Sequence, residues 1–143
     1  MSRYLIVAHQ TAASSELRKC VKDLMRADPE SEFAILIPAT QNGFHMVANE
    51  VRAREESMDR ATESRAMLED AGAKVLATHV GSSNPLLAIE DELRQRPDYD
   101  ALVISTLPSG VSHWLKQDLP HKATKFGLPV HHVVSQARVP AHA

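Results

Sequence analysis

Cysteine is almost absent from this 143-residue chain, which carries Cys20 alone. A single cysteine excludes an internal disulfide framework and a cysteine-rich zinc site. Cys20 falls three residues after Leu17 and four before Leu24, on the apolar face of a predicted helix. We therefore expect a buried and unreactive thiol.

Long hydrophobic runs and an excess of basic residues are also missing. No apolar stretch approaches the ~18 residues of a membrane span, and the run within residues 1–8 is too short for a signal-peptide core. Lys and Arg number 16 against 18 Asp and Glu, which disfavours nucleic-acid binding because phosphate contacts need clustered cations. We expect a cytoplasmic protein with no nucleic-acid or membrane partner.

Motifs for catalysis and metal binding are missing as well. The eight histidines form no His-x3-His pair and no histidine–carboxylate motif. Neither a Gly-x-Ser-x-Gly nucleophile turn nor a P-loop occurs. We expect no metal site, assign no catalytic residue, and do not expect turnover to be the main role.

The sequence does contain an alternation of short apolar runs with amphipathic segments. Five runs are typical of buried strands, namely 3–8, 32–37, 74–80, 100–105 and 130–134. Helical patterns lie between them, at about 16–27, 46–71, 85–94 and, in two short pieces, 111–126. Asn84-Pro85 is a helix start signal and Gly72 a stop signal.

This alternation predicts the fold class. Strands separated by helices form parallel βαβ units with right-handed crossovers. We expect an α/β fold, a five-stranded parallel doubly wound sheet of order 3-2-1-4-5 with helices on both faces. One domain is expected over 1–134, followed by a flexible C-terminal tail at 135–143.

The predicted topology also places a ligand site. Open α/β sheets bind ligands beyond the carboxyl ends of the strands, where the strand order reverses, here between the first and fourth strands. The loop after the second strand borders the same crevice. The candidate ligand-binding residues are His9, Gln10, Thr11, Pro38, Ala39, Thr40, Ser105, Thr106, Ser109, Gly110, Ser112, His113 and Lys116.

The segment after the fourth strand carries the chemistry of an anion site. Hydroxyl groups and backbone N–H groups at a helix start favour anions. Cations then outnumber acids in the stretch 113–125, where Asp118 is the one carboxylate. The alternative is structural: Ser109 or Ser112 caps a helix, Asp118 caps the next one, and Trp114 packs in the core rather than against a base.

Four segments resemble the universal stress protein family: RYLIVA at 3–8, VGSSNP at 80–85, DALVIS at 100–105 and GLPV at 127–130. The resemblance covers about residues 3–134. It implies an α/β fold of the adenine nucleotide alpha hydrolase type and a role in stress response. One branch of that family binds ATP and the other does not.

The glycine pattern of the ATP-binding branch is absent. That pattern, Gly-x2-Gly-x9-Gly-Ser/Thr, falls here on Thr106, Ser109, Leu119 and Pro120. Glycine lets the backbone approach phosphate closely, and proline has no N–H to donate. His9 stands near the position where the family usually has an acidic residue.

The resemblance further implies a homodimer formed through the last strand. Val130, His132 and Val134 are then interface residues, whereas the alternative is an edge covered within the monomer. The main functional hypothesis is a protein that binds a small anion, with ATP, AMP or phosphate as candidates. Two alternatives stay open: a ligand-free homodimeric regulatory protein, and a weak phosphohydrolase that uses the same crevice.

Overall fold

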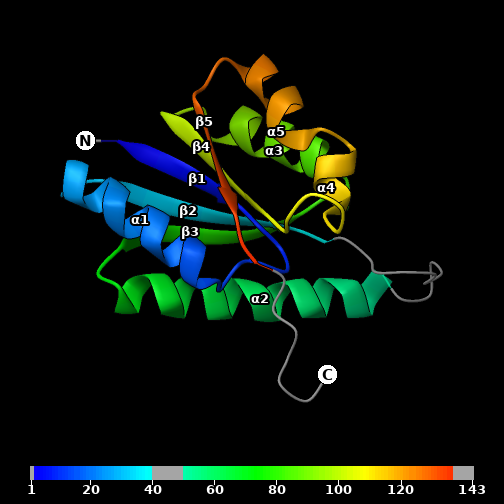
Figure 1. Ribbon diagram of the computed structural model, residues 1–143, viewed down its shortest axis with the longest axis horizontal. Coiled ribbons are helices and arrows are strands. Elements are labelled where there is room, and N and C mark those ends of the chain that lie inside the picture. Colours follow the sequence, from blue (N-terminus) through cyan, green and yellow to red (C-terminus); the bar gives the residue numbers. More distant parts are fainter. Residues whose placement is uncertain (1, 40–49, 137–143) are drawn as a thin grey trace.

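The structure, a computed structural model, describes residues 2–39 and 50–136 (Figure 1). Its strands are β1 (Arg3–Val7), β2 (Glu32–Pro38), β3 (Lys74–Gly81), β4 (Ala101–Thr106) and β5 (Val130–Val134). Its helices are α1 (Ser15–Ala27), α2 (Glu50–Asp70), α3 (Pro85–Gln95), α4 (His113–Lys116) and α5 (Leu119–Lys122), followed by the short 3-10 helix η2 (Ala123–Phe126).

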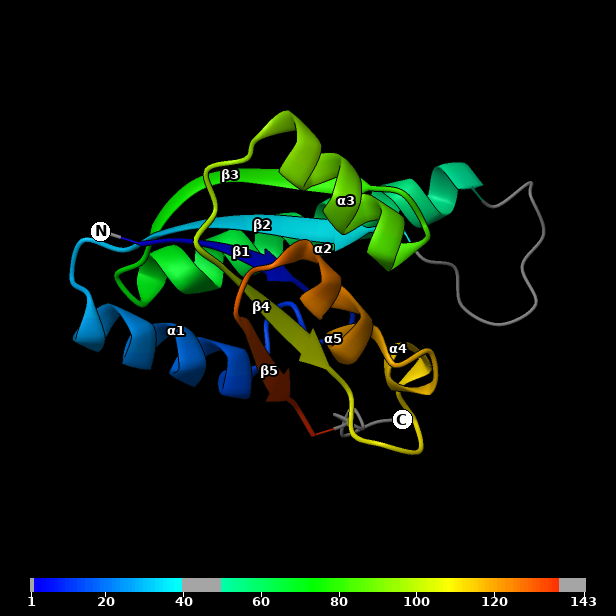
Figure 2. The same ribbon diagram turned by 90° about the horizontal axis from the view of Figure 1, so that it is seen from above.

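All five strands form one parallel sheet in the order β3-β2-β1-β4-β5, as Figure 2 shows. The predicted strand order is confirmed, and every strand boundary lies within one residue of its prediction. The prediction succeeds because β1, β2 and β4 are buried on both faces and appear in the sequence as nearly continuous apolar runs.

Helices cover both faces of the sheet, also as predicted (Figure 1). Helices α1 and α2 pack on one face, where Ile6, Phe33 and Leu68 are completely buried. Helices α3, α4 and α5 lie on the other face, where Leu5 and Ile104 are completely buried. The two cores alternate along each strand because successive side chains of a strand point to opposite faces.

The capping signals of α1 and α3 act as the sequence indicates. The Ser14 hydroxyl accepts a hydrogen bond from the Leu17 N–H. Asn84 Oδ1 accepts from the N–H groups of Leu86 and Leu87, and Pro85 occupies the first turn. Each cap satisfies N–H groups that have no partner inside the helix, so the chain turns sharply from loop to helix at these positions.

Helix α2 lies on the sheet through small side chains. Its core-facing stripe is Ala53, Ser57, Ala61, Ser64 and Leu68, all of them buried. Small residues allow a close approach of the helix to the strands, but the two serines also bring hydroxyl groups into the core. The predicted start of this helix at Met46 lies outside the described residues, because the described helix begins at Glu50.

The segment after β4 folds into short helices. Ser112 caps α4 by accepting from the Leu115 N–H, and the Trp114 side chain is buried in the core, as expected. Asp118 stands at the predicted capping position of α5, but its side chain makes no cap hydrogen bond. Its backbone is left-handed, with φ at 58°, so the capping prediction is wrong in its mechanism.

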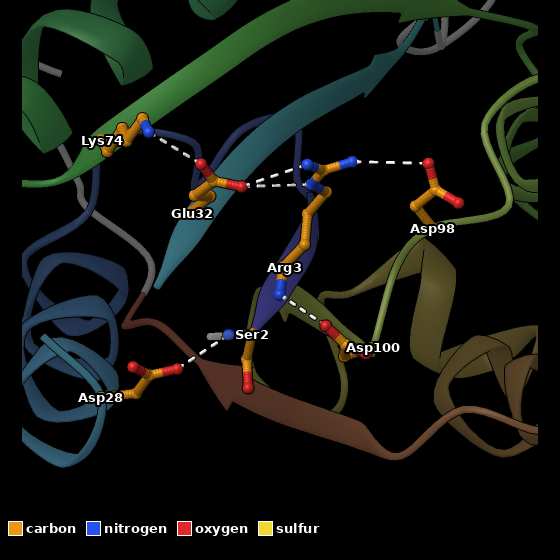
Figure 3. Close-up of polar contacts among 7 residues, drawn as sticks. All are labelled: Ser2, Arg3, Asp28, Glu32, Lys74, Asp98 and Asp100. Atoms are coloured by element: carbon orange, nitrogen blue, oxygen red, sulfur yellow. Dashed lines mark hydrogen bonds and ion pairs between the residues drawn. The ribbon is translucent and has the colours of Figure 1, made fainter. Parts of the chain in front are cut away.

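Charged side chains join the amino ends of the strands (Figure 3). Buried Glu32 accepts from Lys74 Nζ at 2.8 Å and from Arg3 Nη2 at 3.1 Å. Arg3 also pairs with Asp98 at 3.7 Å, and its backbone N–H donates to Asp100 Oδ2 at 2.8 Å. Three strands and the start of β4 are thereby held at the edge opposite to the predicted ligand site.

Two further expectations concern Cys20 and the C-terminal segment. Cys20 is half-buried against the α1–α2 core, and burial followed by the charge of Asp23 raises the pKa of its thiol. Ser135, placed in the predicted tail, is completely buried and its hydroxyl lies 2.7 Å from the Ser14 hydroxyl. Ser135 therefore belongs to the folded part of the chain.

Within residues 2–39 and 50–136, no helix is long and apolar enough to span a membrane.

Candidate functional site

The carboxyl ends of β1 and β4 lie side by side, as the predicted site requires (Figure 2). Thr11 follows β1 and Ser105 lies near the end of β4, and their hydroxyl oxygens are 2.6 Å apart. Both side chains are buried. Two of the candidate ligand residues are thus brought together, and they hydrogen bond to each other.

His9 lies beneath α2 rather than at an open surface. It is 4% exposed, and its Nε2 lies 3.3 Å from the Ser57 hydroxyl of α2. Its Nδ1 is buried and has no hydrogen-bond partner among the described residues. Burial, reinforced by the nearby charge of Arg60, lowers the pKa of His9 to about 4, so the ring is neutral at physiological pH.

Thr106 and His132 form a second polar pair, between β4 and β5. The Thr106 hydroxyl lies 2.8 Å from His132 Nε2. Partial burial lowers the pKa of His132. This contact links the candidate ligand site to the strand for which the sequence predicts a dimer interface.

The loop between β4 and α4 presents donors to solvent. Ser109 and Gly110 are exposed, and Gly110 adopts a φ of 97°, which favours glycine. The Pro108 carbonyl accepts from Val111 and Ser112, whereas the N–H groups of Ser109 and Gly110 have no partner in the described part of the chain. This loop therefore offers two backbone donors and one hydroxyl group.

Side chains of α4 lie next to this loop. Lys116 is exposed, and His113 is exposed with its Nε2 3.1 Å from the Gln117 amide nitrogen. Ser112 is different, because it is buried and caps α4. The alternative that the sequence left open is thus correct for Ser112, while Ser109 makes no capping hydrogen bond.

The loop after β2 contributes little side-chain chemistry. Pro38 and Ala39 are buried, and the Ala39 N–H donates to the Gly81 carbonyl at 3.1 Å. Thr40 lies outside the described residues. Gln10 is exposed beside the crevice.

A pocket of about 440 Å³ adjoins the α4 end of this site. Of its lining residues, His113 alone was predicted as a ligand residue, although the β–α turn at Asn84 lies at the same carboxyl end of the sheet and was a usable signal. The lining residues are Ser83, Asn84, Pro85, Leu86, His113, Trp114, Gln117, Leu119 and Lys122.

Among the side chains of residues 2–39 and 51–136, no group of three or more His, Cys, Asp or Glu is arranged to hold a metal ion.

Strand β5 is the outer strand on its side of the sheet. Val134 is 43% exposed and His132 is exposed, while Val130 packs partly against the α3 side of the core. An outer strand presents unpaired backbone groups that another strand can join. The predicted dimer interface remains a prediction, with its residues at an accessible edge.

The fold and this edge define an open α/β protein whose candidate site consists of hydroxyl, backbone N–H and cationic groups. Neither a protein-family model nor a curated protein matches the sequence. Solved structures do match, and the chain has the fold of universal stress proteins, as the sequence resemblance implied.

Three such structures show the extent of the similarity. A universal stress family protein from Burkholderia pseudomallei has 12% identity and a TM-score of 0.63 over 92% of this chain and 94% of that one. The Archaeoglobus fulgidus universal stress protein in complex with dAMP has 15% identity and a TM-score of 0.59, over 93% of this chain and 97% of that one. A universal stress protein family protein from Arabidopsis thaliana with AMP bound has 10% identity and a TM-score of 0.56, over 96% of this chain and 94% of that one.

Proposed function

We propose that this chain is a universal stress protein that binds an adenosine monophosphate at the β1–β4 crevice. The observation that carries the proposal is the near-full-length similarity to two structures that contain AMP or dAMP. Ligands of open α/β sheets bind at the point of strand reversal, and here that point is the carboxyl end of β1 and β4.

The phosphate group is assigned to the loop after β4. The Ser109 hydroxyl, the N–H groups of Ser109 and Gly110, and the Lys116 ammonium group are accessible donors in this region. Backbone N–H groups and a nearby cation together stabilise phosphate in protein sites. Ser105 and Thr11 hydrogen bond to each other and form the floor of the crevice. We assign neither of them to the phosphate group.

A monophosphate fits this loop better than a triphosphate. Two positions of the family's glycine pattern fall on Leu119 and Pro120. The Leu119 side chain is 2% exposed and belongs to the core, and Pro120 has no N–H to donate. The second half of a triphosphate cradle is therefore missing, and the donors of residues 109–116 are sufficient for one phosphate group.

The test is ligand-induced thermal stabilisation by AMP, dAMP, ATP and inorganic phosphate. AMP at 100 times its dissociation constant stabilises the folded state by about 2.7 kcal/mol. The variant Ser109→Ala/Lys116→Ala should lose the AMP shift and keep its fold. The matched control, Lys19→Ala/Lys22→Ala in α1, should retain it, because both lysines are exposed on a different helix.

Two results contradict the proposal. One is the absence of stabilisation by any nucleotide at millimolar concentration, which favours the ligand-free regulatory protein. The other is an equal AMP shift in the wild type and in Ser109→Ala/Lys116→Ala, which moves the site elsewhere.

The accessible β5 edge supports a homodimer as part of the same proposal. Val134 is a large apolar side chain left 43% exposed on an outer strand. Sedimentation equilibrium should give a dimer for the wild type and a monomer for Val134→Lys, because a buried unpaired ammonium group is costly. A monomeric wild type at micromolar concentration contradicts this part.

A further inference from the structure

A second pocket, of about 400 Å³, lies where β3, the outer strand on the other side of the sheet from β5, meets α3. It shares no lining residue with the pocket next to the β4–α4 loop. Three elements besides β3 contribute to it, namely β2, α2 and α3. The lining residues are Leu36, Arg54, His79, Val80, Gly81, Ser82, Ala88, Asp91, Glu92, Gln95 and Arg96.

A buried carboxylate organises one wall of this pocket. Glu92 is 5% exposed and accepts from the Tyr99 hydroxyl at 2.8 Å and from Arg96 Nη1 at 3.3 Å. Burial, followed by the hydrogen bond to Glu92, raises the pKa of Tyr99, so the hydroxyl stays protonated and donates. The negative charge of Glu92 is thus compensated within the wall, and Arg96 is held in place.

Two nitrogen-bearing groups of the pocket have no partner. His79 Nε2 is buried without a hydrogen bond among the described residues, since the nearest carboxylate oxygen, on Glu92, is 3.8 Å away. Arg54 forms no ion pair or hydrogen bond with the side chains of residues 2–39 and 51–136. A buried polar nitrogen that remains unsatisfied costs free energy, which a ligand atom can recover.

Arg54 is the charged group of the lining that is available to an anion. The lining carries two acidic and two arginine side chains. Glu92 contacts Arg96, and Asp91 lies 3.9 Å from Arg94, which also pairs with Glu90 at 2.8 Å. Neither ion pair uses Arg54. Guanidinium groups match the planar oxygen pairs of carboxylate and the oxygens of phosphate.

We infer that this edge pocket binds a small metabolite through a carboxylate or phosphate group, held between Arg54 and His79. A volume of about 400 Å³ lies in the range of ordinary small-molecule sites. Arg96 borders the same space, with Glu92 and Tyr99 acting as positioning residues. The site is distinct from the nucleotide site proposed for the β1–β4 crevice, because neither the β4–α4 loop nor α4 lines it; the pocket beside α4 and the edge pocket do share the β3–α3 turn and helix α3.

The test is isothermal titration of the full chain with citrate in one arm and inorganic phosphate in the other. Arg54→Ala should weaken binding of the effective probe at least tenfold. Arg52→Ala is the matched control, because this arginine is on the same helix, is also exposed, and does not line the pocket. Its affinity should stay within twofold of the wild type.

A second variant keeps the assignment falsifiable. His79→Gln should reduce affinity while leaving AMP-induced stabilisation unchanged, and Ser109→Ala/Lys116→Ala should leave citrate binding unchanged. Failure of AMP binding with intact citrate binding contradicts the nucleotide proposal alone. Absence of binding in both arms, or equal affinities for Arg54→Ala and Arg52→Ala, overturns the edge site.

Discussion

Thr11 and Ser105 join the first and fourth strands through hydroxyl groups whose oxygens are 2.6 Å apart. The residues are 94 positions apart in the sequence, and both are buried. Their hydrogen bond closes the floor of the candidate crevice, so accessible ligand contacts come from the loops above it. One hydroxyl donates and the other accepts, which leaves neither group unsatisfied.

We predict that Ser105→Ala lowers the free energy of unfolding by about 1–2 kcal/mol, because it leaves the Thr11 hydroxyl buried without this partner. The double variant Thr11→Val/Ser105→Ala should cost less than the sum of the single variants. Urea unfolding of the four proteins measures this coupling. Ser83→Ala, at an exposed serine, serves as the control. If the losses of unfolding free energy in the two single variants add up to the loss in the double variant, the Thr11–Ser105 hydrogen bond is contradicted.

We predict that acidification from pH 7.5 to 4 removes up to about 3 kcal/mol of stability through His9 alone. The unfolded ring has a pKa of 6.5, whereas the folded ring has one of about 4. The unfolded state therefore binds more protons across this window, and stability falls as pH decreases through it. The positive charge of Arg60 contributes to the low pKa, after burial.

The measurement is urea unfolding of the wild type and His9→Gln at several pH values. The variant should show a shallower decrease in stability between pH 6.5 and pH 4. His121→Gln, at an exposed histidine, should follow the wild-type curve. Parallel curves for wild type and His9→Gln count against a buried neutral ring.

We predict a further loss of stability in stronger acid, caused by protonation of Glu32. Hydrogen bonds from Lys74 and then Arg3 lower the pKa of this carboxyl from 4.5. The stabilisation is present above pH 4.5 and is lost as pH falls through the folded pKa. Glu32→Gln should be less stable than the wild type at pH 7, with a difference that shrinks in acid; a difference that persists unchanged at low pH rules out the ionic cause.

We predict that Asp118→Gly stabilises the protein by about 1 kcal/mol, because glycine adopts the left-handed conformation without strain. The side chain of Asp118 forms no cap hydrogen bond that would be lost. Asp118→Ala should destabilise, since alanine lacks the tolerance of aspartate for this conformation. Thermal unfolding compares the three proteins, and a destabilised Asp118→Gly is the contrary result.

We predict that a larger residue at position 81 disturbs the packing at the end of β3. A Cβ atom there lies 3.0 Å from the Ala88 Cβ and 3.1 Å from Leu36 Cδ1. Gly81→Ala should therefore cost about 1–3 kcal/mol. Ala88→Gly restores space, so Gly81→Ala/Ala88→Gly should be more stable than the sum of the two single losses of unfolding free energy implies. Chemical unfolding measures these losses, and strictly additive values contradict a steric contact between residues 81 and 88.

The positions of the strands were predictable because burial on both faces leaves a strong local signal. The run FAILI at 33–37 and the run LVI at 102–104 have no alternation, which is typical of central parallel strands. Helix start signals were equally local, as in the case of Asn84. Such patterns depend on neighbouring residues in the sequence, and general rules of α/β topology then leave only a few possible sheet orders, among them the observed one.

The candidate site was less predictable because it depends on contacts between distant elements. His9 was expected at the ligand edge, but its partner Ser57 is 48 residues away on a helix that lies over the strand end. The edge pocket combines Arg54 of α2 with His79 of β3 and Arg96 of α3. No spacing within one segment indicates that these three side chains line one cavity.

The central position of β1 also constrains how the chain is made. One neighbour, β2, follows within about 30 residues, but the other, β4, begins at Ala101. During synthesis from the N-terminus, β1 is therefore complete and half-paired long before its second partner leaves the ribosome. Folding of this protein thus waits for the last third of the chain. Premature termination before β4 releases a β3-β2-β1 sheet in which the apolar strand β1 is an exposed edge.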